Sequence, residues 1–327
     1  MSGGMGFPSR LPAMLGVRHP IVQGGMSWAS SSAPLALAVS RAGALGVIAA
    51  GPMRPDDLLA AIRAVRAGTG TGTGTGQPFA VNIPLYNKRS AEFLDIAEAE
   101  RVPVVIASQG GPKALPRFHA YGAKWLHVVA SPAHAAKAEA AGVDGLIVVG
   151  GDAGGHPAPD EVSAMVLVRA VARASGIPVI GAGGVADGAG IAAMFALGAE
   201  GVQLGTRFLM TEEASVHPAY KESVRRAGLS DTALVGRGGL PVRQIRNLFT
   251  AEVDAAERAG RGKEELAALY MSRTLKHAAL DGDVDWGKVE AGQSAGLIDD
   301  ILPAGELVAR LVAEAEAVRA RLAGAAA

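Results

Sequence analysis

The 327-residue sequence contains no cysteine. Disulfides, thiolate nucleophiles, cysteine-ligated zinc and iron–sulfur clusters are therefore excluded together. The same absence fits a reducing compartment, and we expect the protein to be cytoplasmic. The N-terminal stretch MSGGMGFPSRLPAMLG also lacks the long apolar segment of a secretory signal.

The chain has no net charge and no long apolar run. Its 31 basic and 31 acidic residues cancel, and no basic block occurs, so we expect no nucleic-acid partner. No run of about 18 residues is apolar throughout, so we expect no membrane span. No two histidines lie at metal-ligand spacing, and no G-x-S-x-G elbow occurs, so neither a metal site nor a serine-hydrolase triad is predicted. The oligomeric state is left open, with a homodimer as one alternative.

Glycine and apolar residues are abundant instead, at 44 residues and 49%. Eight strand-like apolar runs alternate with Ala-rich, helix-like segments that often end in Gly. Such continuous runs are typical of parallel strands buried on both faces, and eight βα alternations predict a (β/α)8 TIM barrel. A doubly wound sheet is the alternative. The runs are IVQGG (21–25), LGVIAA (45–50), FAVNIPL (79–85), VPVVIAS (102–108), KWLHVVA (124–130), GLIVVGG (145–151), PVIGAGG (178–184) and GVQLGT (201–206).

The alternation stops after the eighth run. Residues 212–283 are more polar and are predicted to be mainly helical, with one helix over VRQIRNLFTAEVDAAERAG (242–260). We interpret them as an inserted substrate or lid domain that packs over the barrel mouth. Residues 1–211 and 284–327 would form the barrel.

The ends of the last two barrel strands predict a phosphate site. GAGGVADG (181–188) and QLGTRF (203–208) expose main-chain amides where barrel enzymes often bind phosphate, and the first opens into a helix whose N-terminus attracts anions. We therefore predict Gly183, Gly184, Gly205 and Thr206 as phosphate ligands. Turn glycines without a ligand are the alternative.

Other strand ends suit a flat, polar-edged ring. Gly24 and Gly25 let the backbone approach such a ring, with Met26 as a cover, and Asn82 offers a donor and an acceptor to its edge. Gln109 and Gln203 are weaker candidates of the same kind.

His156 lies in the loop DAGGHP after the sixth strand, where the flanking glycines allow close approach to a ligand. A neutral imidazole accepts protons near neutral pH, so His156 is the predicted catalytic residue. Asp152 either orients it or caps the turn.

Six motifs together resemble a known family: HPIVQGGMSW, VNIPL, DAGGH, IPVIGAGGVADG, GVQLGTRFL and AGQSAGLIDD. They resemble the nitronate monooxygenases, formerly called 2-nitropropane dioxygenases, and equally the related flavin-dependent enoyl-acyl carrier protein reductases and an NADH:quinone reductase branch. The resemblance implies FMN on the barrel, with His156 as the catalytic residue. It implies FMN contacts at Gly24, Gly25, Met26, Asn82, Gly154, Gly183, Gly184, Gln203, Gly205 and Thr206.

The resemblance implies first an FMN-dependent monooxygenase that oxidises alkyl nitronates with O2 to carbonyl compounds and nitrite, with His156 as base. The alternative is a reductase of enoyl thioesters or quinones that uses NAD(P)H as co-substrate. Val128 and Val149 stand where the monooxygenase branch often has Gln or Lys, which keeps the reductase alternative open. A third hypothesis is a sensor that binds FMN and catalyses no reaction.

Overall fold

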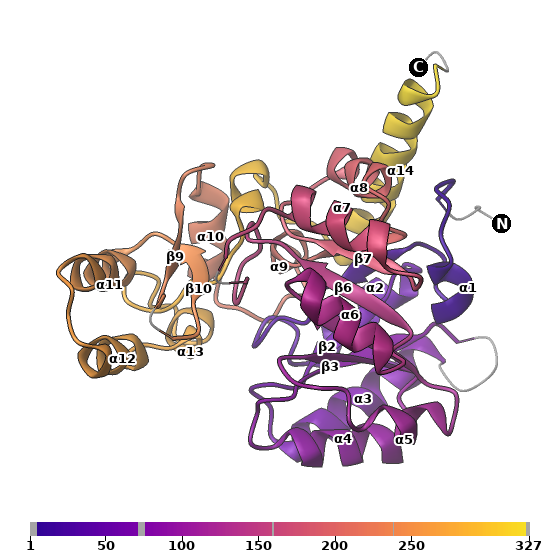
Figure 1. Ribbon diagram of the computed structural model, residues 1–327, viewed down its shortest axis with the longest axis horizontal. Coiled ribbons are helices and arrows are strands. Elements are labelled where there is room, and N and C mark those ends of the chain that lie inside the picture. Colours follow the sequence, from indigo (N-terminus) through magenta and orange to yellow (C-terminus); the bar gives the residue numbers. More distant parts are fainter. Residues whose placement is uncertain (1–4, 71–75, 159, 238, 325–327) are drawn as a thin grey trace.

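The computed structural model describes residues 5–70, 76–158, 160–237 and 239–324 (Figure 1). Eight parallel strands form a TIM barrel, which confirms the predicted fold class: β1 pairs with β8, and each other strand pairs with its sequence neighbour. Main-chain hydrogen bonds of 2.9 and 3.0 Å join Leu45 to Ile21 and Gln23, and they close the cylinder. The strands are β1 (Ile21–Gln23), β2 (Gly46–Ala49), β3 (Phe79–Pro84), β4 (Val104–Ser108), β5 (Lys124–Val129), β6 (Gly145–Val149), β7 (Val179–Ala182) and β8 (Gly201–Leu204).

Apolar side chains fill the barrel interior. Ile106 and Ile147 belong to this inner cluster and are at most 1% exposed. Helix α1 (Leu11–Leu15) closes the N-terminal end of the barrel, because both of its terminal leucines join the same cluster. The end that remains available for a site is the C-terminal one, as in other barrel enzymes.

Helices cover the outside of the barrel, and several end at a left-handed glycine such as Gly142 (φ 86°) or Gly198 (φ 99°), as predicted. Helix α14 packs against α2 and α8 and so occupies the place of the helix after β8. None of the helices in the described ranges has the length and apolar character that a membrane crossing requires. The barrel helices are α2 (Ala33–Arg41), α3 (Pro55–Thr69), α4 (Ser90–Ala99), α5 (Leu115–His119), α6 (Pro132–Ala140), α7 (Ala164–Ala174), α8 (Gly188–Ala196) and α14 (Ala304–Leu322).

The chain between β8 and α14 contains helices and one antiparallel strand pair. Its elements are α9 (Thr206–Leu209), α10 (Pro218–Arg226), β9 (Thr232–Val235), β10 (Val242–Ile245), α11 (Leu248–Arg258), α12 (Lys263–Met271), α13 (Leu275–Ala279) and the 3-10 helix η1 (Gln293–Leu297). The β9–β10 pair was not among the elements predicted from the sequence. The division into two domains at residues 211 and 284 stays a prediction.

The helix predicted over 242–260 was wrong at its start. Residues 242–245 form β10, and α11 begins only at Leu248. The boundary is set by a capping box: the Asn247 carboxamide accepts from the Thr250 amide at 2.9 Å, and the Thr250 hydroxyl accepts from the Asn247 amide at 2.8 Å. Because this box fixes the first helical turn, the preceding residues are free to pair as a strand.

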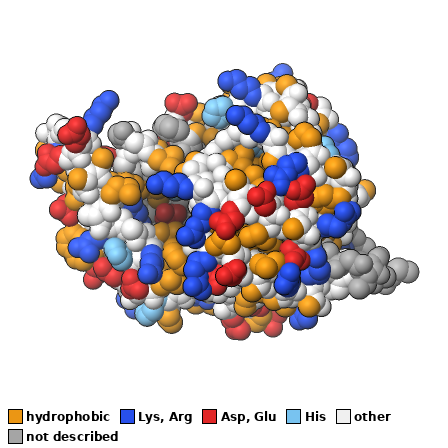
Figure 2. All heavy atoms as spheres, turned by 90° about the horizontal axis from the view of Figure 1, so that it is seen from below, with side chains coloured by type: hydrophobic (Ala, Val, Ile, Leu, Met, Phe, Trp, Pro, Cys, Tyr) orange, Lys and Arg blue, Asp and Glu red, His pale blue; other side chains and the backbone are white. Residues whose placement is uncertain are grey.

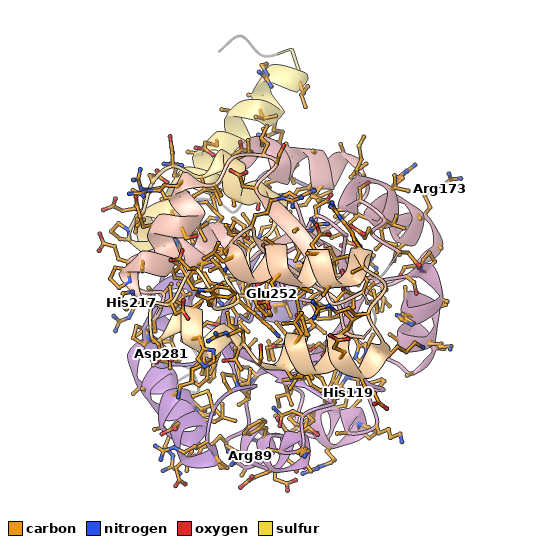
Figure 3. The ribbon with its side chains drawn as sticks, turned by 90° about the vertical axis from the view of Figure 1, so that its left-hand side faces the viewer. Arg89, His119, Arg173, His217, Glu252 and Asp281 are labelled. Carbon is orange, nitrogen blue, oxygen red and sulfur yellow. The ribbon has the colours of Figure 1, made fainter. Side chains whose placement is uncertain are left out.

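Elements β9, β10 and α11 to α13 form a lobe that stands to the left of the barrel in Figure 1. Figure 3 views the molecule from that side. Glu252 of α11 lies near the centre of the outline, whereas Arg89 and His119 of the barrel lie in its lower part. The lobe therefore lies across one end of the barrel. On the face drawn in Figure 2, basic and acidic side chains are interspersed.

Candidate active site

A cavity of about 630 Å³ lies at the C-terminal ends of the strands. Strand-end residues line it on one side, and Tyr220, Thr274, Leu275 and Lys276 line it from the segment between β8 and α14. The structure brings together in this cavity all the residues that the sequence analysis assigned to FMN or catalysis: Gly24, Gly25, Met26, Asn82, Gly154, His156, Gly183, Gly184, Gln203, Gly205 and Thr206.

The loop after β7 presents free amides to the cavity. Gly183 (φ 107°) and Gly184 (φ 71°) are left-handed, and no described residue accepts a hydrogen bond from either amide. Successive amides of this kind form a concave site for an anion. The N-terminus of α8 does not contribute, contrary to expectation, because Glu314 binds the Gly188 amide at 2.9 Å and Asp187 binds the Gly190 amide at 2.8 Å.

The loop after β1 approaches β3 very closely. A Cβ on Gly25 would lie only 2.6 Å from Cβ of Asn82. The Asn82 side chain is fixed because its Nδ2 donates to the Ile106 carbonyl at 3.0 Å. The Asn82 carboxamide therefore lies along the strand ends, where it can hydrogen-bond to the edge of a bound ring.

The end of β8 contributes open space and a hydroxyl. A Cβ on Gly205 would have only the Met26 sulfur within 4 Å, at 3.9 Å. Thr206 is 8% exposed, and its hydroxyl accepts a hydrogen bond of 3.0 Å from the Gly292 amide. The hydroxyl proton of Thr206 remains available to a ligand, and the same side chain fixes the segment that returns from the lobe.

The loop that carries His156 is held by β10. Gly155 and Arg243 exchange main-chain hydrogen bonds of 3.1 and 2.7 Å, and the Arg243 Nε donates to the Gly151 carbonyl at 2.8 Å. Gly154 lies against the returning segment, since a Cβ there would be 2.5 Å from the Ala291 carbonyl carbon. The imidazole of His156 is thus aimed at the cavity by contacts between segments distant in sequence.

The surroundings of His156 favour its neutral form. Its side chain is open to the cavity, but the surrounding walls lower its pKa by desolvation, and the nearby Lys288 ammonium lowers it further. A neutral imidazole has one nitrogen that accepts a proton and one N–H that donates a hydrogen bond.

Asp152 does not orient this histidine. Its Oδ2 accepts from the Ala164 amide at 2.6 Å, at the first residue of α7, so Asp152 caps that helix. His217 likewise caps a helix, because its Nδ1 accepts from the Ala219 amide at 3.1 Å.

Residues 290–292 form part of the cavity wall where the chain returns from the lobe, and they were not predicted as part of the site. Glu290, Ala291 and Gly292 line the cavity, and Lys288 is buried just behind them. The stretch GDVDWGKVEAGQSAG (282–296), which contains both charged residues, resembles a segment near the end of the reductase branch, but it indicated no role for the charged pair. Two strained residues were also missed as such: Trp28 (φ 67°) and Gln109 (φ 56°) line the cavity in left-handed conformations that side chains rarely adopt, a condition common at functional sites.

The fold and the cavity define a (β/α)8-barrel enzyme. The family model for nitronate monooxygenase matches residues 8–314, and the chain belongs to this family of flavin-dependent oxidoreductases. FabK from Thermotoga maritima has a similar structure, with 40% identity and a TM-score of 0.90 over 97% of this chain and 99% of that one.

Two curated relatives differ in the reactions that their names describe. The (3aS,4S,5R,7aS)-5-hydroxy-7a-methyl-1-oxo-octahydro-1H-indene-4-carboxyl-CoA dehydrogenase of Mycobacterium tuberculosis is 33% identical, over 93% of this chain and 95% of its own length. A nitronate monooxygenase of Pseudomonas aeruginosa is 32% identical, over 93% of this chain and 98% of its own length. Family membership therefore establishes an oxidoreductase but not its substrate.

Proposed function

We propose that the protein is an FMN-dependent reductase of enoyl thioesters that takes its electrons from NAD(P)H. The observation that carries this proposal is the chemistry of the cavity wall, which suits a neutral substrate better than an anion. FabK, an enoyl-acyl carrier protein reductase, and the CoA-thioester dehydrogenase support the same substrate class.

The residues present fit FMN. The acceptor-free amides of Gly183 and Gly184 suit its phosphate, together with the hydroxyl of Thr206. Gly25 and Asn82 leave a bare surface beside a fixed carboxamide, as a ring with polar edges requires. When bound, FMN would supply two-electron redox chemistry that no side chain offers.

The wall around the substrate favours a neutral acyl group. Val128 and Val149 line the cavity between the flavin-site residues, and neither donates a hydrogen bond from its side chain. Glu290 also lines it, and the ionised form of its carboxyl would repel an anionic nitronate. An unsaturated thioester is neutral at its reacting carbons and fits apolar walls.

His156 holds the thioester oxygen in this proposal. Because its pKa is lowered, the ring is uncharged at neutral pH and donates one N–H hydrogen bond. Such a bond to the carbonyl oxygen polarises the conjugated double bond for attack at its far carbon. Gly154 and Gly155 contribute main chain, without side chains, to the cavity wall beside the imidazole.

The test uses the FMN-loaded protein under anaerobic conditions. We expect NADH or NADPH to bleach the 450 nm flavin band within about a second, and crotonyl-CoA to restore it. His156→Gln should still be bleached by the nucleotide but should be reoxidised by crotonyl-CoA about 10²- to 10⁴-fold more slowly. If neither nucleotide bleaches the wild-type flavin, the proposal is wrong.

Nitronate monooxygenase activity is the second candidate, and the neutral imidazole of His156 is the observation that favours it. A neutral ring accepts the α-proton of a nitroalkane, and the 32% identical relative carries this activity in its name. Nitrite release in air from 2-nitropropane or propyl-2-nitronate, without NAD(P)H, would support this candidate. Absence of nitrite with both compounds would eliminate it.

A further inference from the structure

Glu290 places a carboxyl group on the cavity wall, beside the loop of His156. A Cβ on Gly155 would lie 3.4 Å from the Glu290 Oε2, so the carboxyl abuts the main chain immediately before the imidazole. The Glu290 backbone is held in place because the buried Tyr220 hydroxyl donates to its carbonyl at 2.8 Å. The Glu290 carboxyl and the His156 imidazole therefore line the same part of the cavity, each from its own segment.

This carboxyl has no partner among the described residues. No hydrogen bond or ion pair reaches either oxygen, even from Lys288 two residues away. The Lys288 ammonium instead lies over the Tyr270 ring, 3.3 Å from its centroid. A polar group in such a wall normally finds a partner, because leaving it unpaired costs free energy. A ligand in the cavity can supply one in place of water.

Burial keeps Glu290 close to its protonation midpoint at neutral pH. Desolvation raises the pKa of Glu290 to about 7, and the Lys288 ammonium opposes this rise. Desolvation in turn lowers the pKa of Lys288 to about 8. A protonated carboxyl donates one hydrogen bond and accepts others, whereas a carboxylate only accepts. The titratable groups around Glu290 are Lys288 on its own segment, His156 and Tyr86 from barrel loops, Tyr220 from α10, Tyr270 from α12 and Lys276 from α13.

We propose that Glu290 is a specificity-determining residue that selects thioesters with a second oxygen function, a hydroxyl or ketone on the acyl chain. This inference rests on the proposed function and deepens it: His156 holds the thioester oxygen, and Glu290 binds the additional oxygen. A hydroxyl satisfies the carboxyl in either protonation state, because it both donates and accepts. A ketone only accepts and therefore requires the protonated form.

The experiment compares binding of hex-2-enoyl-CoA with that of its 4-, 5- and 6-hydroxy and 4-, 5- and 6-oxo derivatives. Dissociation constants are measured on the oxidised FMN-loaded protein, without NAD(P)H, by the change in flavin absorbance. The tryptophan fluorescence of the protein, to which the cavity-lining Trp28 contributes, gives a second readout. We expect at least one oxygenated derivative to bind about 10-fold more tightly than the parent, because it gives the unpaired carboxyl a hydrogen-bond partner.

Two variants and one control identify the carboxyl as the cause. Glu290→Leu should abolish the preference for the oxygenated derivative. Glu290→Gln should retain a preference and lose its pH dependence. In the wild-type protein, binding of an oxo derivative should weaken as pH rises through about 7, because the donor is lost. Glu252→Leu, an exposed carboxylate on α11 (Figure 3), is the matched control and should leave the ratio unchanged.

The inference is overturned if no derivative is preferred by the wild-type protein, or if Glu290→Leu keeps the wild-type preference. Either result stands apart from failure of the proposed function, because binding is measured without electron transfer. If NAD(P)H fails to bleach the flavin while the Glu290-dependent preference persists, the reductase reaction is wrong and the specificity assignment stands.

Discussion

Gly205→Ala tests the flavin site without disturbing the fold. Gly205 has φ −97° and ψ −76°, a right-handed conformation, so alanine can take its place. The added methyl would have only the Met26 sulfur within 4 Å, at 3.9 Å. Because the protein leaves this space open and Gly205 lines the cavity, the methyl would protrude into the volume proposed for FMN. The substitution should therefore weaken FMN binding and leave the stability of the apoprotein almost unchanged.

The expected magnitudes follow from this geometry. The stability of the apoprotein should change by less than about 1 kcal/mol, the usual range for Gly→Ala in a compatible conformation. Extra volume in a filled site costs about 1–3 kcal/mol, which corresponds to roughly 5- to 150-fold weaker FMN binding. Flavin fluorescence quenching on titration of apoprotein gives the dissociation constant, and thermal unfolding of the same preparation gives the stability.

Gly305→Ala is the matched control, because Gly305 in α14 also has nothing within 4 Å of an added Cβ and does not line the cavity. It should leave FMN affinity unchanged. If Gly205→Ala binds FMN within twofold of the wild-type protein, the assignment of Gly205 to the flavin site is refuted.

Four further outcomes are expected. Gly154→Ala should destabilise the protein by about 1–3 kcal/mol in thermal unfolding, because its methyl would lie 2.5 Å from the Ala291 main chain. The kcat/KM of a reaction that uses His156 as base should stay flat down to pH 6.5 and fall only at lower pH, since burial lowers the pKa below that value; His156→Gln should lack this limb. The native stability contributed by this histidine should also decline as pH falls from 6.5 toward the lowered pKa, because the unfolded chain then binds more protons. Arg243→Ala should cost about 1–3 kcal/mol in chemical denaturation, because it leaves the Gly151 carbonyl without its 2.8 Å donor, while Glu161 is 35% exposed and keeps its ion pair with Arg237.

Much of the barrel was predictable because its strands are local patterns. Each of the eight apolar runs became a parallel strand, since burial on both faces demands continuous β-branched residues within a few positions. The same reasoning failed at VRQI (242–245). The residues that follow it are helix-forming, whereas in the structure it pairs with β9, and its Arg243 also bridges to Gly155, almost ninety residues earlier in the chain. Short-range patterns carry no information about that contact.

The candidate site divides in the same way. Strand-end glycines and Asn82 could be placed from sequence, because the carboxyl ends of parallel strands meet at one face of the barrel. Glu290 and Lys288 could not, since their position depends on how the chain returns from the lobe. From the sequence, Asp152 could either orient His156 or cap the turn. The 2.6 Å hydrogen bond from the Ala164 amide shows that it acts as a cap.

Strand β10 positions both the loop that carries His156 and the segment that carries Glu290. Its Arg243 pairs with Gly155 and so positions the His156 loop, while Ile245 donates to the Val289 carbonyl at 2.8 Å and so positions the segment of Glu290. The flavin-site glycines at β7 and β8 make no such contact with β10. Substitutions in β10 should therefore change substrate choice and proton transfer together, and should change flavin affinity less, because among the flavin-site residues only Gly154 lies in a loop that β10 holds. If substitutions in the lobe change substrate choice and proton transfer independently, one of the two segments must be held in place by a contact other than that with β10.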